Sequence, residues 1–214
     1  MYEVNSQLFG SDADLYFKAG MEALAIEDLE ESLSQLERCL LVSSKHLSAR
    51  YNLGIVLSLL DRCDEAMTHF EKILVHNPRY PGIYTAMGQA AFGSYLTHRQ
   101  KVEQYKESMI RLLERAVEED AEDMDAYFSL GNAYMALGNI ESAMICLEKA
   151  YAVYPNSQAI CFVLAKALEM LGRFEDATEM AKRAMTVSIP DDPFRENIQG
   201  LLEELEETRV LSRI

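Results

Sequence analysis

Few residues in this chain could catalyse a reaction or bind a metal, and they are scattered. The four histidines are His46, His69, His76 and His98. Only His69 and His76, seven positions apart, could share one face of a helix. No cysteine or carboxylate completes a metal-ligand set beside them, so we expect no metal site.

Sequence motifs for catalysis are also missing. The chain has no GxGxxG, Walker-type, HExxH or GxSxG motif, and residues 88–93 lack the Lys-Ser/Thr of a phosphate loop. Acid pairs such as Glu118 and Glu119 belong to charged runs, with no cleft that would shift their pKa values. We therefore expect no catalytic residues, no cofactor and no enzymatic activity.

The cysteines indicate a reducing compartment. Cys39, Cys63, Cys146 and Cys161 stand alone, without a CxxC pair. Cys39 and Cys161 fall at packing positions, where buried free thiols are expected. The expected localisation is cytoplasmic.

Charge and hydropathy disfavour nucleic acids and membranes as partners. Lys and Arg number 20 against 35 Asp and Glu, a net charge of -15, which repels polyanions. No apolar run approaches the roughly 20 residues of a membrane span. The N-terminal stretch lacks the basic start and apolar core of a secretory signal.

Acidic residues gather in three clusters, Glu27–Glu31, Glu118–Asp123 and Glu203–Glu207. The simple interpretation is a solvated outer face, and the alternative is a docking surface for a basic partner.

One stretch predicts the architecture. Met124–Ser157 has two helical apolar patterns separated by residues 137–139 and ended by Pro155, which predicts a hairpin of two antiparallel helices. Small residues fall where the helices must cross, and we expect Gly131 to face Ala143. One such hairpin cannot bury both of its apolar faces, so copies are expected to stack.

The same layout recurs with a period of 34 residues. The copies span about residues 13–46, 47–80, 81–123, 124–157 and 158–190.

This pattern resembles the tetratricopeptide repeat (TPR). The positions that match within 124–157 are Tyr127, Leu130, Gly131, Tyr134, Gly138, Ala143, Leu147, Ala150 and Pro155. The resemblance covers residues 11–190 and implies an all-α fold, a right-handed α-α superhelix of about five helical hairpins with a concave groove. The first copy departs most, with Ser32 and Ser44 where Ala and Pro are usual.

Two segments flank the repeats. Residues 1–10 are a lead segment, and the first helix is expected near Asp14–Ile26 with Asp12 as its N-cap. Residues 191–214 predict a C-terminal capping helix, started by Asp192 and Pro193 and acidic on its outer side. Its apolar stripe is Phe194, Ile198, Leu201, Leu202, Leu205 and Val210.

The third copy is nine residues too long, with the insertion at about 92–105. Because this segment keeps a helical rhythm, we expect longer helices that project beyond the stack. It is also the most basic part of the chain, through His98, Arg99, Lys101, Lys106 and Arg111. That charge either keeps the projecting end solvated or contacts an acidic partner or another copy of the chain.

The resemblance also implies where a partner would bind. In this family the fifth residue of each repeat points into the groove, here Phe17, Tyr51, Thr85, Phe128 and Phe162. The predicted partner-binding residues are Phe17, Met21, Tyr51, Asn52, Ile55, Gln89, Phe92, Phe128, Asn132, Met135, Phe162 and Lys166.

This apolar and aromatic set favours a helix or extended peptide with hydrophobic anchors. Phe17 and Met21 replace the Lys and Asn of the family's chaperone-tail clamp, which argues against that role. We expect a protein-binding adaptor or scaffold. The alternatives are a self-associating homo-oligomer, a secretion-type chaperone for hydrophobic segments, or a groove covered by residues 1–10.

Overall fold

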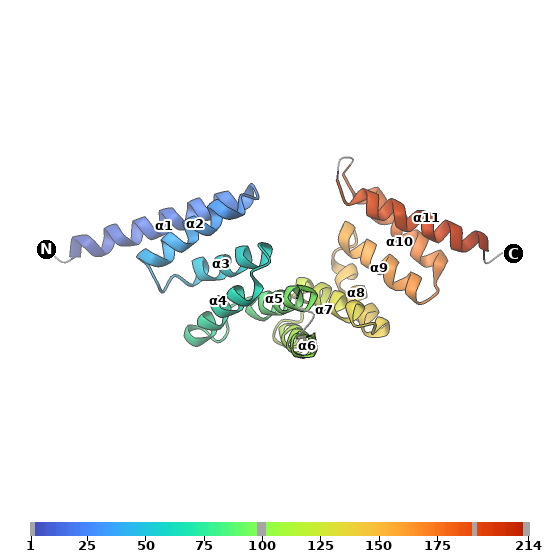
Figure 1. The fold of residues 1–214 in the computed structure, drawn as a ribbon, viewed down its shortest axis with the longest axis horizontal. Helices are drawn as coiled ribbons and strands as arrows, with labels where there is room; N and C mark the ends of the chain where they lie inside the picture. The colour runs from blue at the N-terminus through green and yellow to red at the C-terminus, as the bar shows by residue number, and fades with distance from the viewer. Residues whose placement is uncertain (1–2, 98–101, 190–191, 212–214) are drawn as a thin grey trace. The chain divides into compact units, whose positions relative to one another are not determined.

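The computed structural model describes residues 3–97, 102–189 and 192–211, with side chains placed within 12–97, 103–189 and 192–208. In these ranges the chain forms eleven α-helices and no strand (Figure 1), which confirms the all-α prediction. The helices are α1 (Glu3–Ala25), α2 (Leu29–Val42), α3 (Leu47–Leu59), α4 (Cys63–His76), α5 (Ile83–Thr97), α6 (Val102–Glu119), α7 (Met124–Ala136), α8 (Ile140–Val153), α9 (Gln158–Met170), α10 (Phe174–Val187) and α11 (Arg195–Leu211).

The chain divides into two compact units, Met1–Ala116 and Val117–Ile214. In unit 1, α1 packs on α2 and α3 packs on α4, while α2 contacts α3 and α4 contacts α5. In unit 2, α7 packs on α8, α9 packs on α10, and α11 closes against α9 and α10. Consecutive helices therefore form hairpins, and each hairpin contacts its neighbour within the unit.

The hairpin turns share one hydrogen-bonding pattern. In the α1–α2 turn the N–H of Asp28 donates to the carbonyl of Ala23, which is the long bond of a Schellman motif. The same bond joins Arg62 to Leu57, Asn139 to Tyr134 and Arg173 to Leu168. The residue before each donor has a left-handed backbone: Glu27 (φ 61°), Asp61 (φ 58°), Gly138 (φ 74°) and Gly172 (φ 71°).

A small residue in each first helix lets the hairpin close. A Cβ added to Gly131 would lie 2.7 Å from Cγ of Leu147, closer than carbon atoms can approach. The equivalent neighbours are Leu36 for Gly20, Phe70 for Gly54 and Leu113 for Gly88. Ala143, which was predicted to face Gly131, is also close to it, with its carbonyl oxygen 3.5 Å from the added Cβ, while the Leu147 side chain one turn later is closer.

The third hairpin holds the extra length in its helices. α5 has 15 residues and α6 has 18, whereas α7 and α8 have 13 and 14. Gly88 and Leu113, which touch, are 25 positions apart, against 16 for Gly131 and Leu147, so the nine added residues lie on the turn side of that contact. Of the basic residues noted there, His98, Arg99 and Lys101 lie outside the described residues.

Hydrogen bonds join the lengthened third hairpin to α4. Asp64, in the first turn of α4, accepts a hydrogen bond from Ser94 Oγ at 3.2 Å and from Tyr105 OH at 3.1 Å. Burial, with the Asp64 carboxylate as the second cause, raises the pKa of Tyr105. The added turns of α5 and α6 are therefore anchored to the preceding hairpin.

The first helix starts earlier than predicted. α1 begins at Glu3, so Asp12 lies inside the helix and is not its N-cap, and residues 3–10 extend α1. No proline interrupts residues 3–13, and the helix continues through Gly10, Ser11 and Asp12, where the sequence suggested a start.

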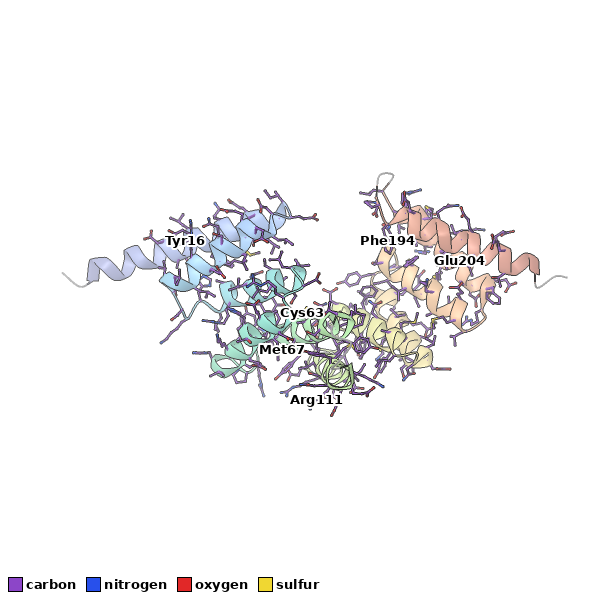
Figure 2. All side chains as sticks on the ribbon, in the orientation of Figure 1. Tyr16, Cys63, Met67, Arg111, Phe194 and Glu204 are labelled. Carbon is purple, nitrogen blue, oxygen red and sulfur yellow. The ribbon has the colours of Figure 1, made fainter. Side chains whose placement is uncertain are left out.

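The last helix covers the final hairpin, as its apolar stripe predicts. Ile198, Leu201 and Leu205 are buried, while Glu203 and Glu204 on the other side are exposed (Glu204 is labelled in Figure 2). α11 begins at Arg195, so Pro193 is not its first residue as predicted; the Asp192 side chain instead accepts from the Phe194 N–H at 2.9 Å in the turn before the helix. The side chain of Val210 lies outside the described residues.

Candidate protein-binding surface

The predicted partner-binding residues all lie on the first helices of the hairpins. In each unit we call these residues the first-helix face; seven lie on α1, α3 and α5 of unit 1, and five lie on α7 and α9 of unit 2. Gln89 and Lys166 are exposed and the other ten are half-buried. None of the twelve is part of the buried core, so each keeps some surface.

Thr85 differs from the other fifth-position residues. It is buried, with 7% of its surface exposed, so it does not contribute to the surface as predicted. The reason is that Ile83, Tyr84, Ala86 and Met87 around it are also buried, which places the start of α5 inside the unit.

Three of the aromatic residues of this face touch the start of the next hairpin or helix. The ring contacts are Phe17 with His46 at 4.8 Å between centroids, Tyr51 with Tyr80 at 5.3 Å, and Phe162 with Phe194 at 4.8 Å. His46, Tyr80 and Phe194 each lie just before the following first helix or α11, and Figure 2 labels Phe194 there. These rings therefore join neighbouring elements as well as forming surface, which sequence reasoning did not predict.

Phe128 is the aromatic residue of the face that is least engaged. It has no ring contact among the residues the structure describes, and Asn132 and Met135 follow it on the same side of α7. All three are half-buried. Phe128 is therefore the aromatic side chain of the unit 2 face with the fewest ring contacts among the described residues.

The apolar surface continues toward the hairpin turns. Leu59 on α3 is 57% exposed, Leu96 on α5 is 61% exposed and Met170 on α9 is 56% exposed. Leu96 lies one turn beyond Phe92, whose ring stacks on Tyr95 at 6.4 Å. The four-residue spacing of Phe92 and Leu96 was the sequence signal for this additional surface residue.

The polar members of the face have simple roles. Asn52 Nδ2 donates to the Ser48 carbonyl at 2.8 Å within its own helix. The ammonium of Lys166 lies 5.9 Å from the centre of the Phe162 ring, within reach of a cation–π contact. Neither arrangement activates a nucleophile or holds a proton for transfer.

The side chains that could bind a metal or take part in catalysis are scattered in the structure, as they are in the sequence. Among residues 12–97, 103–189 and 192–208, no three His, Cys, Asp or Glu side chains are grouped to hold a metal. His69 is half-buried on α4, its Nδ1 has no hydrogen-bond partner, and burial lowers its pKa. His76 ends the same helix, where its Nδ1 lies 2.9 Å from the Lys72 carbonyl.

The four cysteines are buried free thiols, as predicted for Cys39 and Cys161. Burial raises the pKa of the Cys39, Cys63 and Cys161 thiols, which keeps them protonated and poorly nucleophilic. Among the described residues, no helix is both long enough and apolar enough to cross a lipid bilayer.

A family profile and a curated relative match part of the chain. The profile "Anaphase-promoting complex, cyclosome, subunit 3" matches residues 102–184. "Anaphase-promoting complex subunit 3" of Schizosaccharomyces pombe is 25% identical over 156 residues, which are 73% of this chain and 22% of the relative. The chain thus spans about a fifth of the length of the curated relative it matches.

Solved structures cover more of the chain. TTC0263, a thermophilic TPR protein of Thermus thermophilus, superposes with a TM-score of 0.78 at 21% identity, over 89% of this chain and 98% of its own. This likeness agrees with the hairpins, the shared turns and the 34-residue spacing. The chain has the fold of tetratricopeptide repeat proteins.

A second structure has the same fold. MamA of Desulfovibrio magneticus RS-1 gives a TM-score of 0.63 at 24% identity, over 82% of this chain and 94% of its own. At these identities the likeness shows a shared fold, and the fold serves many unrelated functions.

Proposed function

We propose that this chain is a non-enzymatic adaptor or scaffold, and that the first-helix face of each unit binds a segment of a partner protein. The observation that carries the proposal is the exposure of these faces. None of their twelve residues is in the core, and Phe128, with Asn132 and Met135 beside it, has an aromatic ring that no other ring of the described chain covers.

The chemistry of the face favours an apolar helix or peptide as the ligand. Phe128, Met135 and Ile55 offer aromatic and flexible apolar surface, which suits hydrophobic anchors spaced along a helix. A fully desolvated aromatic anchor contributes on the order of 2 kcal/mol to binding.

The similar proteins and the free thiols support a place for this chain in a protein complex and in the cytoplasm. The fission yeast relative is named as a subunit of a complex, and we propose a comparable place for this chain within a protein assembly. Four buried free thiols suit a reducing compartment, and we propose the cytoplasm.

Site-specific photocrosslinking tests this function. A photoreactive phenylalanine analogue replaces Asn132 on the face or, as a control, Ile145, which is 61% exposed on α8. Crosslinked proteins are identified by mass spectrometry, and the partner segment is purified and titrated. We expect a defined partner from position 132 only, and a roughly tenfold weaker Kd for Phe128→Ala with unchanged helical circular dichroism.

The other outcomes separate the alternatives. Equal crosslinking from positions 132 and 145 would contradict binding at this face. Crosslinks only to a second copy, together with a mass that rises with concentration in light scattering, would favour the self-associating scaffold. A set of unrelated hydrophobic clients would favour the chaperone.

A further inference from the structure

Exposed apolar side chains and unpaired carboxylates lie together at the turn end of the first two hairpins. Ile26 is 78% exposed and Leu59 is 57% exposed; Glu27 directly follows Ile26, Asp61 lies two residues after Leu59, and both acids are exposed. Neither carboxylate has an ion-pair or hydrogen-bond partner among the described residues. We call Ile26, Glu27, Leu59 and Asp61 the turn patch.

The two turns that carry the patch are neighbours. α3 packs against both α1 and α2, and Figure 1 shows the α1–α2 and α3–α4 turns at the same end of these hairpins. The electrostatic neighbours of Arg62, in the α3–α4 turn, also indicate that α2 is close. Glu65 raises the pKa of Arg62 most strongly, and Glu37 and Glu30 of α2 raise it further. The start of α2 therefore lies beside that turn.

The surroundings of the patch are negative. Asp28, Glu30 and Glu31 follow Glu27 and are exposed. The nearby cation, Arg62, is already held by Glu65 through bonds of 2.7 and 2.8 Å. The surface therefore presents apolar side chains within an uncompensated negative field, which a cationic partner would neutralise.

The backbone gives a second reason to assign a role to these carboxylates. Glu27 and Asp61 have φ values of 61° and 58°, a conformation that disfavours any residue with a Cβ. The equivalent turns of unit 2 use Gly138 and Gly172. Unit 1 thus keeps acidic side chains where glycine would be more stable, a form of strain that often accompanies function.

The patch is continuous with the first-helix face. Leu59 lies one turn beyond Ile55 on α3, so one bound helix could lie along both. A helix that buries its apolar side on Leu59 and Ile26 would bring residues one turn away close to the two acidic turns.

We infer that the turn patch docks a basic amphipathic helix of a partner protein, with apolar side chains on Ile26 and Leu59 and Lys or Arg paired with Glu27 and Asp61. The inference rests on the protein-binding function proposed above and adds the charge of the partner. Without that charge, the exposed acids would have no role beyond solvation.

Two synthetic peptides of about 16 residues, long enough for four helical turns, are the probes. They share one leucine face and carry either lysine or glutamate on the other. Binding is measured by fluorescence anisotropy and melting by circular dichroism. We expect the lysine peptide to bind more tightly, and Glu27→Gly with Asp61→Gly to weaken it about fivefold while raising the Tm by about 2 °C or more.

Matched controls distinguish the patch from general attraction to an acidic protein. Glu203→Gln with Glu206→Gln removes the same charge from α11 and is expected to change the Kd by less than about twofold. Ile26→Ser with Leu59→Ser is expected to weaken binding roughly tenfold. Leu41→Ser with Val75→Ser, at exposed positions near the other end of α2 and α4, is expected to leave it unchanged.

Several results would overturn the inference. A higher Tm with an unchanged Kd in the double glycine variant would show that the carboxylates do not bind. Equal weakening by the α11 control would show net-charge attraction only, and a changed molecular mass would assign the patch to a second copy. If both peptides bind alike and Phe128→Ala weakens both, the proposed function stands and the inference about partner charge fails.

Discussion

At the scale of single residues, hairpin closure depends on positions that have no room for a side chain. Gly131→Leu should force α7 away from α8, because its Cβ alone would lie 2.7 Å from Leu147 Cγ. Overpacking of this kind costs about 2 kcal/mol, or roughly 5 °C in Tm for a chain of this size. Thermal melting by circular dichroism measures the change.

Gly200 provides the control for Gly131→Leu. No atom lies within 4 Å of a Cβ added to Gly200 in α11. Gly200→Ala should therefore raise stability by about 0.5–1 kcal/mol through helix propensity alone. If both substitutions shifted the Tm in the same direction, the close approach at Gly131 would not govern its effect.

A single histidine should make stability depend on pH. Burial, followed by Lys72 and Arg50, lowers the pKa of His69 in the folded chain below its ordinary 6.5. The unfolded chain therefore takes up this proton first, so stability is full above about pH 6.5 and falls as the pH drops toward the folded pKa. His69→Gln should reduce the loss of Tm between pH 7 and pH 5.5.

His76→Gln is the matched comparison for His69. His76 is exposed at the end of the same helix, so His76→Gln removes a histidine that is not buried and serves as the comparison. A profile that is the same for wild type and His69→Gln would assign the dependence to other groups.

At the scale of elements, the lengthened third hairpin depends on its attachment to α4. Tyr105→Phe removes the hydroxyl that donates to Asp64 and should destabilise by about 0.5–1 kcal/mol. Asp64→Asn should have a similar cost, and the double variant should lose less than the sum because the two residues share one interaction. Urea unfolding of the four proteins gives the coupling energy, and full additivity would contradict the attachment.

The element pattern was predictable because its signals are local. The spacing of Gly20, Gly54, Gly88 and Gly131, with Pro78 and Pro155, gave the repeat phase and the extra length of the third hairpin from the sequence alone. The stripe of α11 likewise predicted which residues it buries. Such signals need only neighbours along the chain.

Other features depend on packing between elements and could not be predicted. That the Leu147 side chain approaches Gly131 more closely than Ala143 depends on the height at which the two helices cross. The contact of Phe162 with Phe194 joins residues 32 positions apart across a loop of irregular length. Such contacts reduce the exposed area of the first-helix faces, and whether these faces bind a partner stays a prediction.

At the scale of the whole molecule, stability should be distributed by neighbourhood. In repeat proteins each hairpin gains stability from its own packing and from the interface with adjacent hairpins. The chain also divides into two compact units, each with its own internal contacts. Damage to one hairpin should therefore weaken its neighbours more than distant hairpins.

Hydrogen exchange of paired variants tests this distribution. Gly54→Leu would place its Cβ 2.4 Å from Phe70 Cε1 in unit 1, and Gly131→Leu does the equivalent in unit 2. We expect Gly54→Leu to speed amide exchange in α3 and α4 roughly tenfold or more, with a smaller change in α2 and α5 and none in α9 and α10. Gly131→Leu should speed exchange most in α7 and α8, with a smaller change in α9 and none in α1 and α2. The reason is that α9 adjoins the damaged hairpin and α1 and α2 do not. Uniform acceleration of all helices by either variant would instead mean that the whole chain unfolds as a single cooperative unit.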